Sequence, residues 1–328
     1  MGKRWANLAA EILSGIAGGL VALLGAADFF GAGILVPAST PGFQRALDAT
    51  VMATGLAAAA IASRPVRRRI ERWLPIEADN PVHALALALT VILLGTDVAV
   101  ISLTDVLATA QSLPPLTLAD LLYQEAPFLV FALVGVGLFI RRELPDTSRR
   151  LGFVVPVWWQ VVLALAAAGV FFAFAQGIDS LGHAWTPGIA RRIDEATNHV
   201  FGQLGGPVGI IALAIVPGLC EELLFRGALQ PRIGLVATAL LFTSIHTQYA
   251  LSLDTAAVLA IALGLGLLRK YTNTTTSCTC HVTYNLLVGV GLGGSLLNGA
   301  VLVEAALVAV SAYAIWTNRR RAAITAQP

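Results

Sequence analysis

Charged side chains are scarce in this sequence. Lys, Arg, Asp and Glu together make up 12% of its 328 residues, about half the share of roughly 25% that is usual in soluble domains. A soluble fold of this length has too little polar surface to keep its apolar residues from water. The composition therefore excludes a soluble enzyme, a nucleic-acid-binding domain and a disordered scaffold. The formal net charge of +2 implies no strongly charged partner.

Cysteine is also scarce. Three Cys residues are too few for a disulfide framework. Cys278 and Cys280 would point about 200° apart on a helix with 3.6 residues per turn, so we interpret both as packing residues. Cys220, beside a glutamate, is interpreted as a small buried apolar residue.

Apolar residues dominate what remains, at 57% of the chain. A helix needs about 20 mostly apolar residues to cross a bilayer, and the chain holds between about eight and ten such segments. We therefore expect an all-α fold, a polytopic transmembrane helix bundle of about ten spans. The expected spans are residues 7–29, 46–63, 82–103, 121–140, 152–176, 207–229, 234–250, 255–269, 275–294 and 296–316.

Basic residues follow every second expected span, which predicts their side of the membrane. Lys and Arg gather in cytoplasmic loops, so both termini are expected to be cytoplasmic. The apolar part of the first span is long for a signal peptide, and we expect it to stay as an uncleaved helix. Lys3 and Arg4 precede the first span. The basic residues that follow or end the even-numbered spans are Arg64, Arg67, Arg68, Arg69, Arg72, Arg141, Arg142, Arg149, Arg150, Arg226, Arg232, Arg269, Lys270, Arg319, Arg320 and Arg321.

The longest external loop is expected over residues 177–206. Apolar residues recur in it at helical spacing, which predicts an amphipathic helix lying on the outer face of the membrane. The residues of this stripe are Ile189, Ile193, Ala196, Val200 and Leu204.

The sixth expected span ends with two adjacent carboxylates and an arginine. Glu222 and Arg226 are four residues apart, so they share a helix face and can pair. Glu221 points about 100° away from Glu222 around the helix, so its carboxylate has no partner at helical spacing and faces another part of the bundle. The alternative is an ordinary helix end, with Arg226 reaching the interface and both glutamates in water.

Two later spans each carry a histidine and a partner at the same four-residue spacing, Phe242 with His246 and His281 with Asn285. Alone, each pair is typical of hydrogen bonding within a membrane bundle. Together with the glutamates, they supply a general base and donors for an oxyanion. The other acidic residues of the spans are interpreted as scattered singly near span ends or loops: Asp97, Asp120, Glu125 and Glu304.

The order Glu-Glu-x-x-x-Arg, Phe-x-x-x-His, His-x-x-x-Asn resembles the CPBP family, the CAAX-protease and bacteriocin-processing (ABI) intramembrane proteases. The type II CAAX prenyl protease, or Ras-converting enzyme, is the best-known member type. The resemblance covers roughly residues 207–295, and Phe225-Arg226-Gly227 matches the usual ending of the first motif. It implies a protease core over 207–295. Transmembrane helices and the external amphipathic loop would precede it over 1–206, and a last span with a basic cytoplasmic tail would follow over 296–328.

The resemblance also implies an activity, an intramembrane endopeptidase acting on a membrane-associated or prenylated peptide. Its partners would be that peptide and the lipid bilayer, without nucleic acid, in the plasma membrane of a prokaryote. In the family the first glutamate activates water. The roles implied are Glu221 as the base, His246 holding and polarising the water, His281 and Asn285 forming the oxyanion hole, and Glu222, Arg226 and Phe242 in support.

Three alternatives remain open from the sequence. Glu221, His246 and His281 would make a His₂Glu zinc set. Because His-Glu-x-x-His is absent and no helix carries a ligand-spaced His pair, a carboxylate-activated water without zinc is favoured. Intramembrane Glu and His also mark transporters and proton-coupled carriers, although the paired halves of such proteins are not evident. The third alternative is a non-catalytic membrane chaperone or immunity protein.

One expectation fits the motifs poorly. At about 1.5 Å per residue, His246 would lie on the order of 10 Å in depth from Glu221 and His281. Either the seventh span begins in the cytoplasm, or the seventh and eighth spans form a shallow hairpin.

Overall fold

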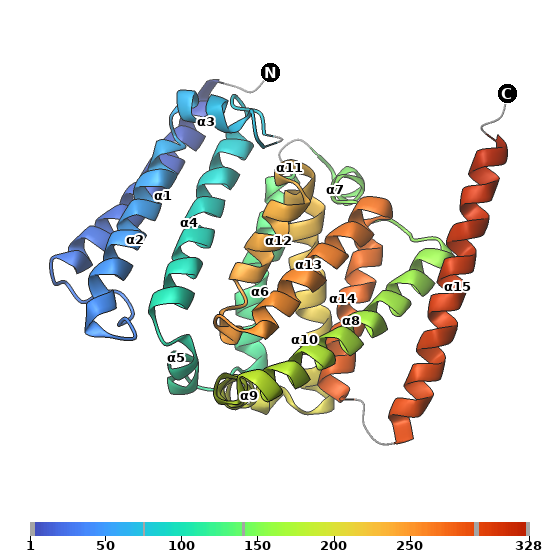
Figure 1. Ribbon diagram of the computed structural model, residues 1–328. Coiled ribbons are helices and arrows are strands. Elements are labelled where there is room, and N and C mark those ends of the chain that lie inside the picture. Colours follow the sequence, from blue (N-terminus) through green and yellow to red (C-terminus); the bar gives the residue numbers. More distant parts are fainter. Residues whose placement is uncertain (1–3, 75, 140–141, 292–294, 326–328) are drawn as a thin grey trace. The chain divides into compact units, whose positions relative to one another are not determined.

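The computed structural model describes residues 4–74, 76–139, 142–291 and 295–325 (Figure 1). Its regular elements in these ranges are helices, with two isolated β-bridges between loops. This confirms the predicted all-α polytopic bundle. The chain forms two compact units: unit 1 comprises residues 1–114, 186–199 and 230–262, and unit 2 comprises residues 115–185, 200–229 and 263–328.

Unit 1 is built mainly from the N-terminal helices. Its elements are α1 (Arg4–Phe29), α2 (Pro41–Ala60), α3 (Arg64–Ile70), α4 (Pro81–Leu103), α5 (Val106–Ser112), most of α9 (Pro187–Phe201), α11 (Gln230–Ile233), α12 (Leu235–Ser244), η3 (Thr247–Tyr249) and the first half of α13 (Leu253–Tyr271).

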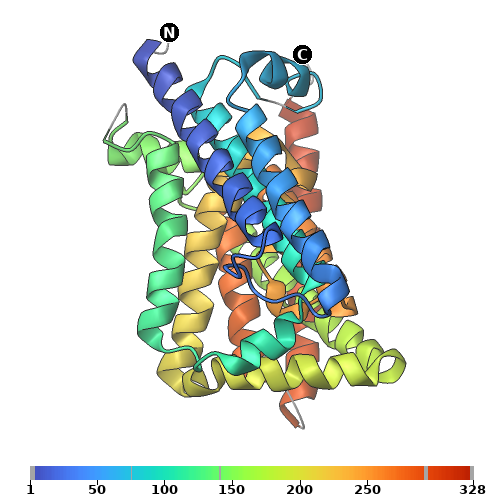
Figure 2. The same ribbon diagram turned by 90° about the vertical axis from the view of Figure 1, so that its left-hand side faces the viewer.

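Helices α1 and α2 run side by side in backbone contact (Figures 1 and 2). A Cβ atom on Gly55 would lie 2.1 Å from the amide nitrogen of Ala22, and one on Gly18 would lie 2.3 Å from that of Ala59. Membrane helices use such small residues to gain packing contacts that lipid cannot supply. The glycines therefore fix this helix pair.

Arg67 is a buried arginine that joins three segments at one end of unit 1. Its side chain is 2% exposed and donates to the carbonyl oxygens of Ile61 and Ala78, each at 2.8 Å. It also pairs with Glu11 at 2.8 Å. A buried guanidinium with this many acceptors is satisfied, so Arg67 serves the structure of the bundle.

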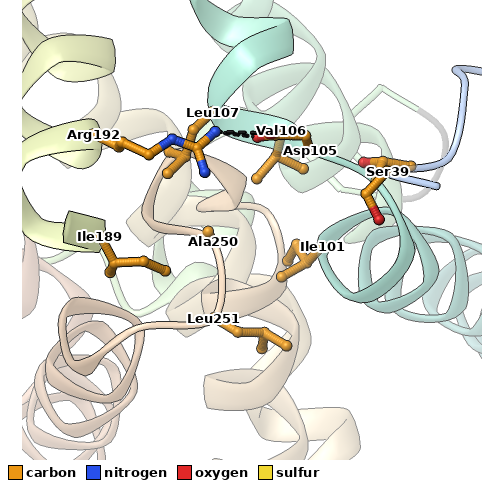
Figure 3. A pocket seen from close by; sticks show the side chains of 10 residues that line it. Ser39, Ile101, Asp105, Val106, Leu107, Ile189, Arg192, Ala250 and Leu251 are labelled. Atoms are coloured by element: carbon orange, nitrogen blue, oxygen red, sulfur yellow. Dashed lines mark hydrogen bonds and ion pairs between the residues drawn. The ribbon is translucent and has the colours of Figure 1, made fainter. Parts of the chain in front are cut away.

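The end of α4, the start of α5, helix α9 and the loop at residues 250–251 line a pocket of about 250 Å³ within unit 1 (Figure 3). Ile189 and Leu251 form part of its apolar wall, and Arg192 pairs with Asp105 at 2.5 and 2.7 Å. The Ala108 amide and the Arg192 guanidinium hold the pKa of the Asp105 carboxyl below its ordinary value. This ion pair ties α9 to the start of α5.

Unit 2 holds the rest of the chain. Its elements are α6 (Leu118–Gly135), α7 (Leu144–Leu151), α8 (Trp158–Trp185), η1 (Gly202–Leu204), α10 (Pro207–Glu222), the π-helix η2 (Leu223–Leu229), the end of α13, α14 (Thr274–Val290) and α15 (Ser295–Thr325).

Helices α10 and α14 form the centre of unit 2 and pack antiparallel. A Cβ atom on Gly218 would lie 2.6 Å from the Val282 side chain, and one on Gly289 would lie 2.7 Å from the Ile210 side chain. Glycine on each helix thus brings the two backbones together near both ends of the pair.

The number of candidate spans is lower than predicted. By length and composition, six helices of the described residues could cross a membrane, or seven if the bent pair at 42–60 and 64–70 is one span. The prediction of a span over 234–250 is wrong, because α12 ends at Ser244 after ten residues. Ten residues rise only about 15 Å, half of the hydrocarbon core.

The segment expected as an external loop is helical almost throughout. Helix α8 runs on to Trp185 and α9 begins at Pro187. The predicted amphipathic helix is present in α9, where Ile193 and Ala196 are buried against Val106 and Leu107. Its position relative to the membrane stays a prediction.

The chain is an integral membrane protein by its apolar helices. The cytoplasmic location of the termini stays a prediction. Of the basic residues behind it, Lys3 and Arg141 lie outside the described residues, as do the side chains of Arg4, Arg319, Arg320 and Arg321.

Candidate active site

The first motif lies where α10 changes into a π-helix. Helix α10 ends at Glu222, and η2 continues it from Leu223 to Leu229 with wider turns. Such π-segments occur often at functional sites. Pro217 lies one turn earlier and has no N–H, so it leaves the carbonyl of Leu213 without its helical donor. The helix is therefore irregular on both sides of the two glutamates.

Glu222 is the centre of a buried polar cluster. Its Oε1 atom lies 3.4 Å from Arg226 Nη1 and 3.2 Å from His281 Nδ1, and Ser277 Oγ donates to its Oε2 atom. Glu222 and Arg226 are 0% and 1% exposed. The expected ion pair is present, and the alternative of two water-exposed glutamates at a helix end is wrong.

Glu221 has a different environment. The residue is 6% exposed, yet its Oε2 atom is buried without a hydrogen-bond partner among the described residues. A buried acceptor of this kind costs about 1–3 kcal/mol when it stays unsatisfied. The structure thus gives the two adjacent glutamates opposite conditions, one with its oxygens engaged and one with an oxygen available.

The third motif lies on α14, along a stripe with four-residue spacing that Ser277, His281 and Asn285 share. Because an ionised Glu222 can only accept, His281 Nδ1 donates to it. Asn285 Nδ2 donates to the Leu213 carbonyl at 3.3 Å. That carbonyl is the one that Pro217 leaves without a helical donor, so Asn285 is held to α10.

Gly218 sets the distance between the first and third motifs. A Cβ atom there would lie 2.6 Å from Val282 Cγ2 and 3.1 Å from the Val282 backbone nitrogen. Val282 follows His281 directly, and Gly218 precedes Glu221 by less than one turn. The missing side chain thus permits the approach that joins Glu222 to His281.

The second motif lies in unit 1. Phe242 and His246 share a face as predicted, with ring centroids 4.7 Å apart, and His246 Nδ1 lies 2.8 Å from the Phe242 carbonyl. Ser244 Oγ donates to Asp97 Oδ2 at 3.0 Å, which ties α12 to α4. The structure brings Glu222, Arg226, His281 and Ser277 together in unit 2. The role of His246 beside Glu221 stays a prediction.

Sequence reasoning missed three polar residues of these clusters. Ser277 precedes His281 by four residues, a spacing that could have shown it. Asp97 and Glu125 were interpreted as scattered carboxylates, although each stands alone in an apolar helix, where an ionisable residue is costly and usually has a function. Asp120 is in fact a capping residue, bonded to Thr117 at the start of α6.

The predicted zinc ligands are only partly assembled within one unit. Glu221 and His281 both belong to unit 2, but His246 belongs to unit 1. Among the described residues of unit 2, no three His, Cys, Asp or Glu side chains bring ligand atoms within 4.8 Å of one another. Unit 2 alone therefore supplies no complete set. Cys220, Cys278 and Cys280 are free and buried, in keeping with packing roles.

Fold and site together define a polytopic helical membrane protein with a buried Glu–Arg–His–Ser cluster. Residues 203–287 match the family described as type II CAAX prenyl endopeptidase Rce1-like, and this segment contains all three motifs. The resemblance inferred from the motifs is thus confirmed, and the family is one of CAAX-type proteases.

One curated relative is the uncharacterized protein YpbD of Bacillus subtilis (strain 168). It is 27% identical over 157 residues, which are 47% of this chain and 78% of the relative. No solved structure matches the chain.

Proposed function

We propose that this protein is an intramembrane endopeptidase that hydrolyses a peptide bond of a membrane-associated or prenylated peptide. The observation that carries the proposal is the contrast between adjacent glutamates. Glu222 is engaged by Arg226, His281 and Ser277, whereas Glu221 keeps a buried oxygen that no described residue bonds. A carboxylate placed in this way is suited to take a proton from water.

In the proposed reaction, Glu221 accepts one proton from a water molecule while the water oxygen bonds to the scissile carbonyl carbon. The C–N bond then breaks, and the same proton passes from Glu221 to the leaving amine. General base and acid catalysis by one positioned group contributes typically 10²–10⁴-fold. His246 would hold and polarise the water, as the family resemblance implies.

The oxyanion of the tetrahedral intermediate would be stabilised from α14. Asn285 uses one N–H on the Leu213 carbonyl and has a second to donate. His281 donates from Nδ1 to Glu222, so its Nε2 atom donates only when the ring is charged. Glu222 holds the imidazole in this orientation, as the carboxylate of a catalytic triad does. Arg226 Nη1 in turn lies 3.4 Å from Glu222 Oε1 and holds that carboxyl group in place.

Zinc is the alternative means of activating the water. Glu221, His246 and His281 would hold the ion, which would act as a Lewis acid and make the bound water a stronger nucleophile. Glu222 would then orient His281 through Nδ1, as carboxylates commonly do behind metal-binding histidines. We favour direct activation by Glu221, because His281 and Asn285 share a helix face, as oxyanion donors would, and no helix carries a ligand-spaced His pair.

The test is cleavage in lipid vesicles that contain the purified protein and a synthetic membrane-anchored peptide. Two peptides of one sequence, with and without a prenyl group on cysteine, separate the substrate classes, and mass spectrometry identifies the new ends. We expect one cleavage site with the wild type, and cleavage at that site reduced about 10²–10⁴-fold with Glu221→Gln. An absence of cleavage together with substrate-driven ion flux would favour the transporter instead.

A further inference from the structure

Glu125 lies on the inner face of α6, within an apolar segment. The buried residues of this helix are Leu121, Glu125 and Ala132, a spacing that places them on one stripe. Glu125 is 7% exposed, and its Oε2 atom is buried without a hydrogen-bond partner among the described residues. A carboxyl group in this position has a cost in stability and no evident structural task.

Apolar contacts on either side place Glu125 against the first motif. One turn before it, Leu121 belongs to a cluster against which Leu213 and Val216 of α10 pack. One turn after it, the Phe128 ring lies 6.0 Å from the Phe225 ring of η2. Helix α6 therefore packs parallel to α10 and η2, with the chain running in the same direction in both. The α6 position between these contacts faces the α10 residues between Val216 and Phe225.

Of the residues in that interval, Glu221 is the one whose side chain, like that of Glu125, has a buried oxygen in want of a hydrogen bond among the described residues. The charges of Glu125 and Glu221 are close enough to interact, and each side chain has one buried oxygen without a hydrogen-bond partner in the part of the chain that the structure describes. Buried polar atoms in native proteins almost always bond to protein or water. One water molecule with two hydrogens can satisfy one oxygen on each glutamate, since buried waters typically make about three hydrogen bonds.

We propose that Glu125 is a second catalytic carboxyl group, which holds the attacking water together with Glu221. This inference rests on the proposed function. Glu221 takes one hydrogen of the water as a proton during the attack, as described above. Glu125 accepts the other hydrogen in a hydrogen bond and directs the water oxygen toward the carbonyl carbon, and no bond to Glu125 forms or breaks.

The first test compares cleavage rates of single and double variants. Glu125→Gln keeps the size of the side chain and puts an amide in place of the carboxyl group that accepts a hydrogen bond from the water. We expect kcat to fall about 10²-fold, the loss typical of a misplaced reactant, with KM unchanged. In a Glu221→Gln background the same substitution should cost almost nothing, because both residues act on one water.

Glu304→Gln is the matched control. Glu304 is also an intramembrane carboxyl group of unit 2 whose buried Oε1 atom has no hydrogen-bond partner among the described residues, but it lies against Gly169 of α8. We expect it to cleave at the wild-type rate. A Glu125→Gln variant with wild-type kcat, or one that loses the same factor in both backgrounds, would overturn the proposal.

A second measurement separates this inference from the proposed function, because it needs no substrate. The apolar reagent dicyclohexylcarbodiimide modifies buried carboxyl groups, and mass spectrometry locates the modified residue. We expect Glu221→Gln to change the modification rate of Glu125 and Glu304→Gln to leave it unchanged. An unchanged rate in Glu221→Gln would overturn the shared site even in an active protease. A changed rate in a protein that cleaves no peptide would support the shared site and refute the protease.

Discussion

Replacing Glu222 by Gln should destabilise the protein strongly. The carboxylate is 0% exposed and engages Arg226, His281 and Ser277. Gln removes the charge that compensates the buried guanidinium, and its NH₂ group cannot accept from any of these three donors. Removing one partner of a buried pair costs about 3–5 kcal/mol. We therefore expect the free energy of unfolding to fall by about 3–5 kcal/mol.

The assay is unfolding of purified protein in a mild detergent by added sodium dodecyl sulfate, followed by circular dichroism. Glu221→Gln is the control, since it differs by one position and removes no described hydrogen bond of Oε2. We expect that control to stay within about 1 kcal/mol of the wild type. The double variant Glu222→Gln, Arg226→Gln should recover part of the loss, because it leaves no uncompensated charge. The reasoning fails if Glu222→Gln is as stable as the wild type.

Three further predictions concern packing, an ion pair and zinc. Gly218→Ala places a methyl group 2.6 Å from the Val282 side chain and should destabilise by about 1–3 kcal/mol, whereas unchanged unfolding would show that α10 and α14 do not pack as described. Arg192→Gln should destabilise by less than about 1 kcal/mol at pH 7, as expected for an exposed pair. The pKa of Asp105 lies below its ordinary value of 3.8 in the folded protein. The stability difference between Arg192→Gln and the wild type should therefore shrink below pH 3.8 and vanish once the pH is below the pKa of folded Asp105. A stability difference that persists at still lower pH would contradict the ion pair as its cause. Elemental analysis of purified active protein should find no stoichiometric zinc; zinc that is lost with activity on chelation and restored with it would reverse this expectation.

Local spacing made part of the site predictable. Glu222 and Arg226 pair because four residues bring them to one helix face, and the same rule places Phe242 beside His246. These two contacts could be predicted from the spacing of residues along the chain, because each lies within one helix or its direct continuation.

Contacts between helices were not predictable from spacing. On α6, no polar residue stands three or four positions from Glu125, so helical spacing did not single it out. Its significance depends on which α10 residues face it. The bond from Asn285 to the Leu213 carbonyl needed both the effect of Pro217 and the packing of α14 on α10. A single sequence specifies which faces are apolar, but not which faces meet.

Hydropathy also misjudged some helix boundaries. The apolar residues of 234–250 predicted a span, but α12 ends at Ser244 and the chain turns at His246. Polar residues after 176 were interpreted as a loop, yet α8 continues to Trp185 and ends just before Thr186-Pro187. Proline and the residue before it mark that end better than polarity does.

The most direct test of the proposed protease is the turnover of Glu221→Gln beside its stability. Gln keeps the shape of the side chain and removes the base, so cleavage should fall by about 10²–10⁴-fold while unfolding stays near that of the wild type. Turnover equal to the wild type would contradict the role of Glu221. So would a reversed pair of variants, with Glu221→Gln unfolded and Glu222→Gln folded but inactive.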